Sequence, residues 1–134
     1  MKKYIGADIS ELKIDESITA KGKNSLIPKA SVITVDDAIS LCKEYAQLVR
    51  EQIDSNALIF LFGSIIKGTA NTGSDIDTAI VSKKLDDDFF AVAARLSSLA
   101  HNFSWDIEVH AIAYEDWRKG NPHVFEIQKW GVAV

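Results

Sequence analysis

The chain has 134 residues and a formal net charge of −4, and hydrophobic residues make up 47% of it. A chain of this size and composition can bury a core of its own, so the sequence predicts a globular protein that needs neither a disulfide nor a metal to fold. The negative charge argues against broad electrostatic binding to nucleic acid, although a metal ion or a helix N-terminus can still attract an anionic nucleotide.

The cellular compartment is indicated by the cysteine count and by the N-terminal segment. Cys42 is the single cysteine, so an internal disulfide is excluded and a reducing compartment is expected. Asp8, Glu11 and Lys13 interrupt the N-terminal segment, which therefore resembles neither a signal peptide nor a membrane anchor. Since no window approaches ~18 consecutive apolar residues, we expect a cytoplasmic protein without a membrane-spanning segment.

The chain divides into an N-terminal extension, residues 1–35, and a main domain, residues 36–134. The extension contains a loop-like stretch rich in glycine, asparagine and proline, and we expect a hairpin or an arm there. The main domain begins with a helix that either Thr34 or Asp36 can cap, because apolar residues recur after them at three- and four-residue spacing.

The remaining elements follow from apolar patterning and from turn residues. The continuous apolar run 57–62 is too short for a buried helix and predicts a central strand. The acidic run at 86–88 suits the positive end of a helix dipole, and Asn121-Pro122 is typical of a helix start. In chain order we predict a strand at 57–62, a short helix at 65–69, strands at 75–81 and 105–113 separated by a helix at 86–101, a helical turn at 115–119 and a helix from 121 to 130. This order indicates an α+β (mixed α/β) fold.

The candidate chemistry begins at Gly63-Ser64, directly after the buried strand. A glycine there lets backbone amides approach an anion, and Ser64 adds a hydroxyl donor. Asp75 and Asp77 are two residues apart on the next strand and point to the same face. Two neighbouring carboxylates repel each other, and a divalent cation such as Mg²⁺ would make the arrangement favourable. Each pattern alone is also compatible with an ordinary turn or a solvated strand end.

A third acid-bearing strand follows at 105–113. Asp106, Glu108 and His110 alternate there with apolar residues, so their side chains share one face. Two strands with acids on like faces could meet at one metal site. The other interpretation is the solvent-facing side of an edge strand.

The run from Gly63 to Asp77, Gly-Ser-Ile-Ile-Lys-Gly-Thr-Ala-Asn-Thr-Gly-Ser-Asp-Ile-Asp, resembles the signature of the DNA polymerase β-like nucleotidyltransferase superfamily, and in particular its minimal nucleotidyltransferase branch. The resemblance covers about residues 36 to 130. It implies the nucleotidyltransferase fold, in which helices pack on a small mixed sheet. It also implies that a nucleoside triphosphate reacts with two Mg²⁺ ions bound and releases pyrophosphate, and ATP is the nucleotide that we expect here.

The resemblance assigns a role to each matching residue. Asp75 and Asp77 are the expected catalytic metal ligands, and Gly63, Ser64, Lys67 and Ser74 are the expected nucleotide-binding residues. Lys67 is equally compatible with a solvated surface lysine. The third catalytic carboxylate, also a metal ligand, is expected to be Glu108, with Asp106 as the second choice. His110 is expected to be a hydrogen-bonded neighbour of the site rather than a ligand.

The acceptor of the nucleotide is left open by the sequence. Small members of the branch act with a helical HEPN-type protein in toxin–antitoxin-like pairs, which implies AMP transfer to a hydroxyl of a protein partner. The alternatives are transfer to a small-molecule hydroxyl, as in antibiotic-modifying relatives, and a non-catalytic nucleotide-binding or interaction module. Homo-oligomerisation also stays open.

Overall fold

The computed structural model describes residues 33–134, with the exception of 72–73 and 105. Residues 32–134 form one compact unit, and the predicted N-terminal extension lies almost wholly outside the described residues. Among the helices of the described part, none is both long enough and apolar enough to cross a membrane.

The sheet has four strands, and both parallel and antiparallel pairs occur in it. They are β1 (Leu58–Phe62), β2 (Ile76–Ser82), β3 (Ile107–Ala113) and β4 (Val132–Ala133), in the spatial order β3-β2-β1-β4. β1 pairs antiparallel with both β2 and β4, whereas β2 and β3 are parallel. The parallel pair requires a crossover, which the helices between β2 and β3 supply. The expected small mixed sheet packed by helices is confirmed.

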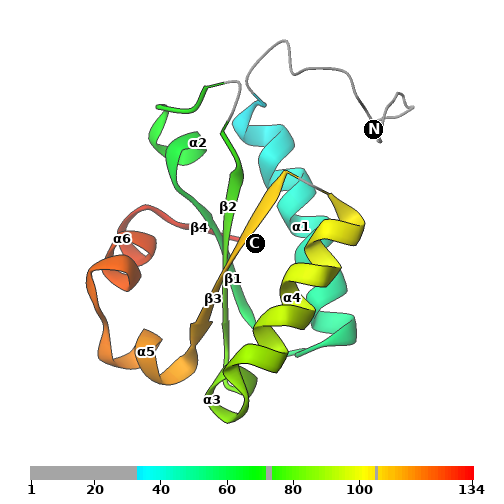
Figure 1. The fold of residues 1–134 in the computed structure, drawn as a ribbon. Helices are drawn as coiled ribbons and strands as arrows, with labels where there is room; N and C mark the ends of the chain where they lie inside the picture. The colour runs from blue at the N-terminus through cyan, green and yellow to red at the C-terminus, as the bar shows by residue number, and fades with distance from the viewer. Residues whose placement is uncertain (1–32, 72–73, 105) are drawn as a thin grey trace. The chain divides into compact units, whose positions relative to one another are not determined.

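Helices cover both faces of this sheet (Figure 1). The long helices α1 (Val35–Gln52) and α4 (Phe89–Phe103) lie on one face, and α5 (Tyr114–Lys119) and α6 (Pro122–Trp130) lie on the other. Two short helices, α2 (Ser64–Lys67) and α3 (Lys84–Asp87), directly follow β1 and β2 along the chain.

The face under α1 and α4 carries the larger hydrophobic core. Alternate residues of β2 and β3, among them Ile76, Ile80 and Ile107, are buried there in one cluster with apolar residues of α1 and α4. The Tyr45 hydroxyl donates a hydrogen bond of 2.8 Å to the backbone oxygen of Leu96. This bond satisfies the polar group of a fully buried tyrosine and ties α1 to α4.

Cys42 lies in this core and is fully buried, with its Sγ 3.2 Å from Thr78 Oγ1. Burial raises the pKa of the Cys42 thiol to about 11. Because only the thiolate reacts quickly, we expect the folded protein to resist an aromatic disulfide reagent at pH 8 and the urea-unfolded protein to react at least about 100-fold faster. Absorbance of the released thiolate measures both rates. Equal rates in the two states would contradict the buried position.

The opposite face carries a smaller core under α5 and α6. Ala79, Val81 and Ile112 of the sheet pack there against Val124 and Ile127 of α6. The rings of Phe60 and Trp117 stack at its border, with centroids 5.1 Å apart. This core covers only part of this face of the sheet. Polar side chains occupy the rest of the face, at the end of the sheet where β2 and β3 begin.

The predicted helix starts at Thr34 and Asn121 are present. Thr34 Oγ1 accepts a hydrogen bond of 3.0 Å from Asp37 N, and Asn121 Oδ1 accepts one of 2.9 Å from Val124 N. Pro122 occupies the first turn of α6, as predicted. Each cap satisfies a backbone amide that the helix itself leaves unpaired.

Two parts of the predicted element order are wrong. The acidic run does not start one helix, because the chain breaks at Asp88 (φ −148°, ψ 85°) between α3 and α4. The Asp88 side chain then caps α4 by accepting a hydrogen bond of 3.3 Å from Ala91 N. The two-residue strand β4 was not predicted, because two residues are too few to show alternation; Val134 N extends its pairing by donating to Ile59 O at 2.9 Å.

Candidate active site

Asp77 and Glu108 are brought together by the parallel pairing of β2 and β3. They are register partners, and both project from the face that α5 and α6 partly cover. Their neighbours Ile76 and Ile107 are buried on the opposite face. Because side chains alternate along a strand, burial of these isoleucines fixes the direction in which both acids point. The side chain of Asp77 is 22% exposed, and that of Glu108 is 54% exposed.

His110, two residues beyond Glu108 on β3, completes a group of three. Its Nε2 lies 3.1 Å from Asp77 Oδ1 and 3.9 Å from Glu108 Oε1. One ligand atom from each of the three residues lies within 4.8 Å of the others, which is close enough for a shared cation. The expectation that His110 is a hydrogen-bonded neighbour of the acids agrees with these distances.

The three groups change each other's proton affinity. Partial burial alone would raise the pKa of Asp77, but hydrogen bonds with His110 and Glu108 outweigh it and hold that pKa below its usual value. The pKa of Glu108 is raised, first by its hydrogen bond with Asp77 and then by burial. The pKa of His110 is raised by its hydrogen bond with Asp77, against the effect of burial. These contacts thus favour the ionised form of Asp77 and the protonated forms of Glu108 and His110 relative to the isolated groups.

Gly63 lets the turn after β1 pass directly beside Asp77. Its backbone has φ +88° and ψ −155°, a conformation that glycine adopts without strain. A Cβ atom at this position would collide with Asp77 Oδ2 and would lie 3.0 Å from Asp77 Cγ. Ser64 follows as the first residue of α2 and is half-buried. The Gly63-Ser64 turn and the Asp77 side chain therefore lie directly beside each other.

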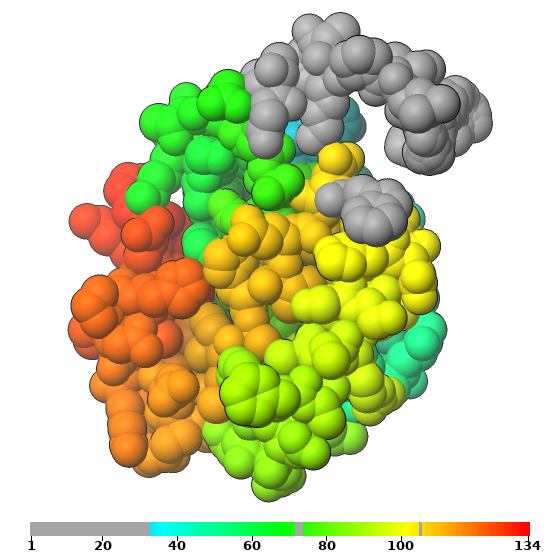
Figure 2. All heavy atoms as spheres, viewed as in Figure 1, coloured from blue at the N-terminus to red at the C-terminus, as the bar shows by residue number. Residues whose placement is uncertain are grey.

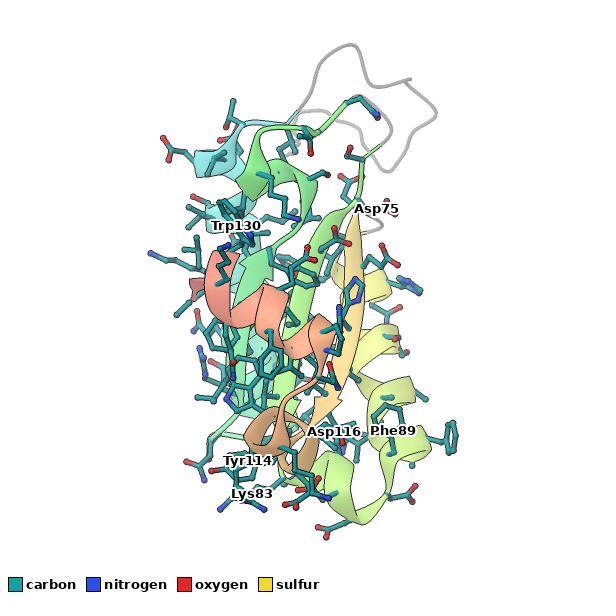
Figure 3. All side chains as sticks on the ribbon, turned by 90° about the vertical axis from the view of Figure 1, so that its left-hand side faces the viewer. Asp75, Lys83, Phe89, Tyr114, Asp116 and Trp130 are labelled. Atoms are coloured by element: carbon teal, nitrogen blue, oxygen red, sulfur yellow. The ribbon has the colours of Figure 1, made fainter. Side chains whose placement is uncertain are left out.

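Asp75 and Ser74 lie just before β2, at the end of the sheet where β2 and β3 begin (Figure 3). Asp75 is exposed and is not a member of the group formed by Asp77, Glu108 and His110. Its charge nevertheless adds to the effects that raise the pKa of Glu108. The Ser74 hydroxyl accepts a hydrogen bond of 2.9 Å from Asn71 N.

Asp106 takes part in strand pairing through its backbone. Its carbonyl oxygen accepts a hydrogen bond of 2.7 Å from Ile76 N, and its own amide donates one of 3.2 Å to Ser104 Oγ. Its carboxylate is not part of the three-residue group around Asp77. On geometry, Glu108 is therefore better placed than Asp106 to act with Asp77.

Lys67, the expected phosphate contact, is paired with an acid of α6. Its Nζ lies 2.9 Å from Glu126 Oε2 and 6.0 Å from the ring centroid of Trp130. Both partners in the ion pair are partly exposed, so the pair is screened by water and contributes little to stability. A phosphate could compete with Glu126 for the Lys67 ammonium group.

His123 belongs to the site region, although nothing in the sequence pattern singled it out. Its ring centroid lies 5.4 Å from that of His110 and 5.7 Å from that of Phe62. It occupies the first turn of α6, and the sequence predicted this helix without indicating that its first turn lies near His110 of β3. Figure 2 shows the C-terminal helices, orange to red, adjoining β3 on the molecular surface.

A mixed sheet that holds two acids on adjacent strands beside a Gly-Ser turn places possible ligands for a divalent cation next to groups that can bind a phosphate. The comparison with known families agrees, since the profile of the nucleotidyltransferase domain matches residues 42–128. That match spans more than half of the chain. The chain belongs to the nucleotidyltransferase domain family, and the expected enzyme class is confirmed.

Solved structures with a similar fold include a predicted nucleotidyltransferase from Sulfolobus solfataricus, with 18% identity and a TM-score of 0.53 over 72% of this chain and 78% of that one. This likeness supports the fold. A toxin–antitoxin with AMP-PNP has 25% identity and a TM-score of 0.49 over 68% of this chain and 69% of that one. A mutant of the toxin–antitoxin MntA–HpeT has 25% identity and a TM-score of 0.43, with 69% of each chain covered. No curated protein matches the sequence closely enough to count as a relative.

Proposed function

We propose that this chain is a Mg²⁺-dependent nucleotidyltransferase that transfers AMP from ATP to a hydroxyl group of a protein partner. The observation that carries the proposal is the register pairing of Asp77 with Glu108, directly beside the Gly63-Ser64 turn. This arrangement places acidic ligands next to a turn with backbone amides and a hydroxyl, the two kinds of group that a metal-bound triphosphate needs. Membership of the nucleotidyltransferase domain family supports the reaction class.

The donor set fits a divalent cation. Asp77 and Glu108 are register partners on one face of the sheet, and neighbouring carboxylates repel each other, so a cation between them would offset that repulsion. Asp77 and Glu108 would hold the metal, and Asp75 would bind at the exposed end of the site. When bound, the ions would neutralise phosphate charge and favour loss of the acceptor proton.

The chain's own residues have distinct tasks in this proposal. The Gly63 and Ser64 amides and the Ser64 hydroxyl donate to phosphate oxygens, and Lys67 leaves Glu126 to contact the triphosphate. Glu108 is the more exposed of the two paired acids, so its carboxylate is the one that an entering acceptor hydroxyl can reach. It accepts the proton of that hydroxyl as the oxygen attacks the α-phosphorus and pyrophosphate leaves.

Glu108 and Asp106 can be separated by a pair of matched substitutions. We expect Glu108→Gln to lower the transfer rate by at least about 100-fold, because it removes a metal ligand and a proton acceptor. Asp106→Asn should cost less than about tenfold, since the backbone pairing of Asp106 with Ile76 is unchanged. Steady-state transfer rates measure both effects, and a larger loss in Asp106→Asn would reverse the assignment.

The acceptor is tested with labelled ATP. Purified protein would be incubated with Mg²⁺, ATP labelled on the α-phosphate and the product of the adjacent gene, and the reaction would be resolved on a denaturing gel and by mass spectrometry. We expect an AMP adduct on a hydroxyl side chain of that partner, and no adduct when ATP is labelled on the γ-phosphate only.

The alternative outcomes are informative. Label on an aminoglycoside or another small hydroxylated compound, with none on protein, would show that the acceptor is a small molecule. Binding of ATP in calorimetry without transfer to any acceptor would contradict the enzymatic proposal and favour a nucleotide sensor. The absence of both binding and transfer would favour an interaction module.

A further inference from the structure

The group formed by Asp77, Glu108 and His110 contains a nitrogen donor as well as two carboxylates. Their ligand atoms all lie within 4.8 Å of one another, and two of the separations are 3.1 Å and 3.9 Å. Atoms that bind one small cation at about 2.1 Å can be at most about 4.2 Å apart. Shifts of about half an ångström in exposed side-chain atoms would therefore let all three residues bind a single ion.

The imidazole of His110 is held in place by its neighbours. The Phe62 ring meets it edge-on, with centroids 4.9 Å apart, and the His123 ring lies 5.4 Å away. The edge that carries Nε2 faces both carboxylates, since the distances to Asp77 and Glu108 are measured from this same atom. A ring fixed in this way needs little reorganisation to bind a metal.

From this geometry we infer that His110 Nε2 is a direct metal ligand together with Asp77 and Glu108, and that this mixed nitrogen–oxygen centre prefers Mn²⁺ to Mg²⁺. Mg²⁺ strongly favours oxygen ligands in near-ideal octahedral geometry, whereas Mn²⁺ binds the same carboxylates and, as a first-row transition ion, tolerates an imidazole nitrogen better. The inference rests on the proposed function, because it concerns the same site. It changes the role of His110 from a hydrogen-bonded neighbour of Asp77 to a residue that selects the ion.

The two roles of His110 exclude each other. As a neighbour, Nε2 carries a proton and donates it to Asp77 Oδ1. As a ligand, the same nitrogen offers its lone pair to the ion and holds no proton. A measurement of metal–nitrogen coupling therefore separates them, and it does not depend on catalysis.

The test is pulsed electron paramagnetic resonance of Mn²⁺ bound to the protein, combined with calorimetric titration of Mn²⁺ and Mg²⁺. The chain has three histidines, so His110→Asn, His123→Asn and His101→Asn cover every imidazole. His101 is exposed on α4 and serves as the remote control, and His123 serves as the near one. Circular dichroism would verify folding, with His110→Gln as a second variant.

We expect imidazole nitrogen coupling to bound Mn²⁺ in the native protein and in the His123 and His101 variants, and loss of this coupling in both His110 variants. Mn²⁺ should bind the native protein at least about tenfold more tightly than Mg²⁺. The His110 variants should lose about tenfold or more in Mn²⁺ affinity and less than about threefold in Mg²⁺ affinity. Absence of nitrogen coupling in the native protein, its persistence without His110, or failure of Mn²⁺ to bind would each overturn the inference.

The same samples separate this inference from the proposed function. Transfer of AMP by a protein whose bound Mn²⁺ has no nitrogen ligand would leave the function intact and remove the inference. Nitrogen coupling that depends on His110, in a protein that transfers no AMP, would support the inference and contradict the proposed function.

Discussion

Asp77→Asn is expected to lower the transfer rate by at least about 1,000-fold while the protein stays folded. Asp77 is the most enclosed acid of the site, and it is in contact with the Gly63 turn, with His110 and with Glu108. The substitution keeps the shape of the side chain but removes the negative charge that a cation requires. Transfer of label from ATP measures the rate, and thermal unfolding monitors the fold.

Asp116→Asn is the matched control for this substitution. Asp116 is an exposed acid of α5, and Figure 3 shows it at the end of the sheet opposite to Asp75. We expect its replacement to leave the transfer rate within about twofold of the native value, as is usual for an exposed position away from the site. Equal losses in the two variants would show that general surface charge, rather than the Asp77 site, is responsible.

Gly63→Ala is expected to destabilise the protein by roughly 2–4 kcal/mol and to abolish transfer. The added methyl group would collide with the Asp77 carboxylate, and the backbone at φ +88° and ψ −155° is strained for any residue with a Cβ. The chain must therefore shift both the turn and the acid. Urea unfolding measures the free-energy change, and label transfer measures activity.

Gly68→Ala separates the collision from the backbone effect. Gly68 also has a positive φ, +80°, but a Cβ there would meet nothing within 4 Å. We expect a loss of only about 1 kcal/mol and retention of transfer. If Gly68→Ala were as damaging as Gly63→Ala, the close approach to Asp77 would not be the reason for the glycine.

The parts of the fold that were predictable depend on short-range physics. The Thr34 and Asn121 caps and the buried strand β1 follow from local patterns of a few residues. The break at Asp88 was missed because an acidic residue suits both a cap and a first helical turn. β4 was missed because its two residues are specified by pairing with β1 and not by their own sequence.

The site was predictable to the extent that its residues lie in one motif or on one strand face. Alternation placed Glu108 and His110 on a shared face, and the structure brings both to Asp77. The proximity of His123 and the pairing of Lys67 with Glu126 depend on how α6 returns across the sheet. The position of α6 is set by tertiary packing, which is difficult to predict from a single sequence.

The pairing of Asp77 with Glu108 also has a consequence for the fidelity of folding. If β3 slipped by one residue along β2, every side chain of β3 would change face. Glu108 would then enter the core under α1 and α4, and Ile107, which is 2% exposed, would be turned toward the solvent-accessible side. Burying an unpaired carboxylate and exposing an isoleucine both cost free energy. The same hydrophobic alternation that stabilises the sheet thus protects the alignment of the two acids against misregistered alternatives.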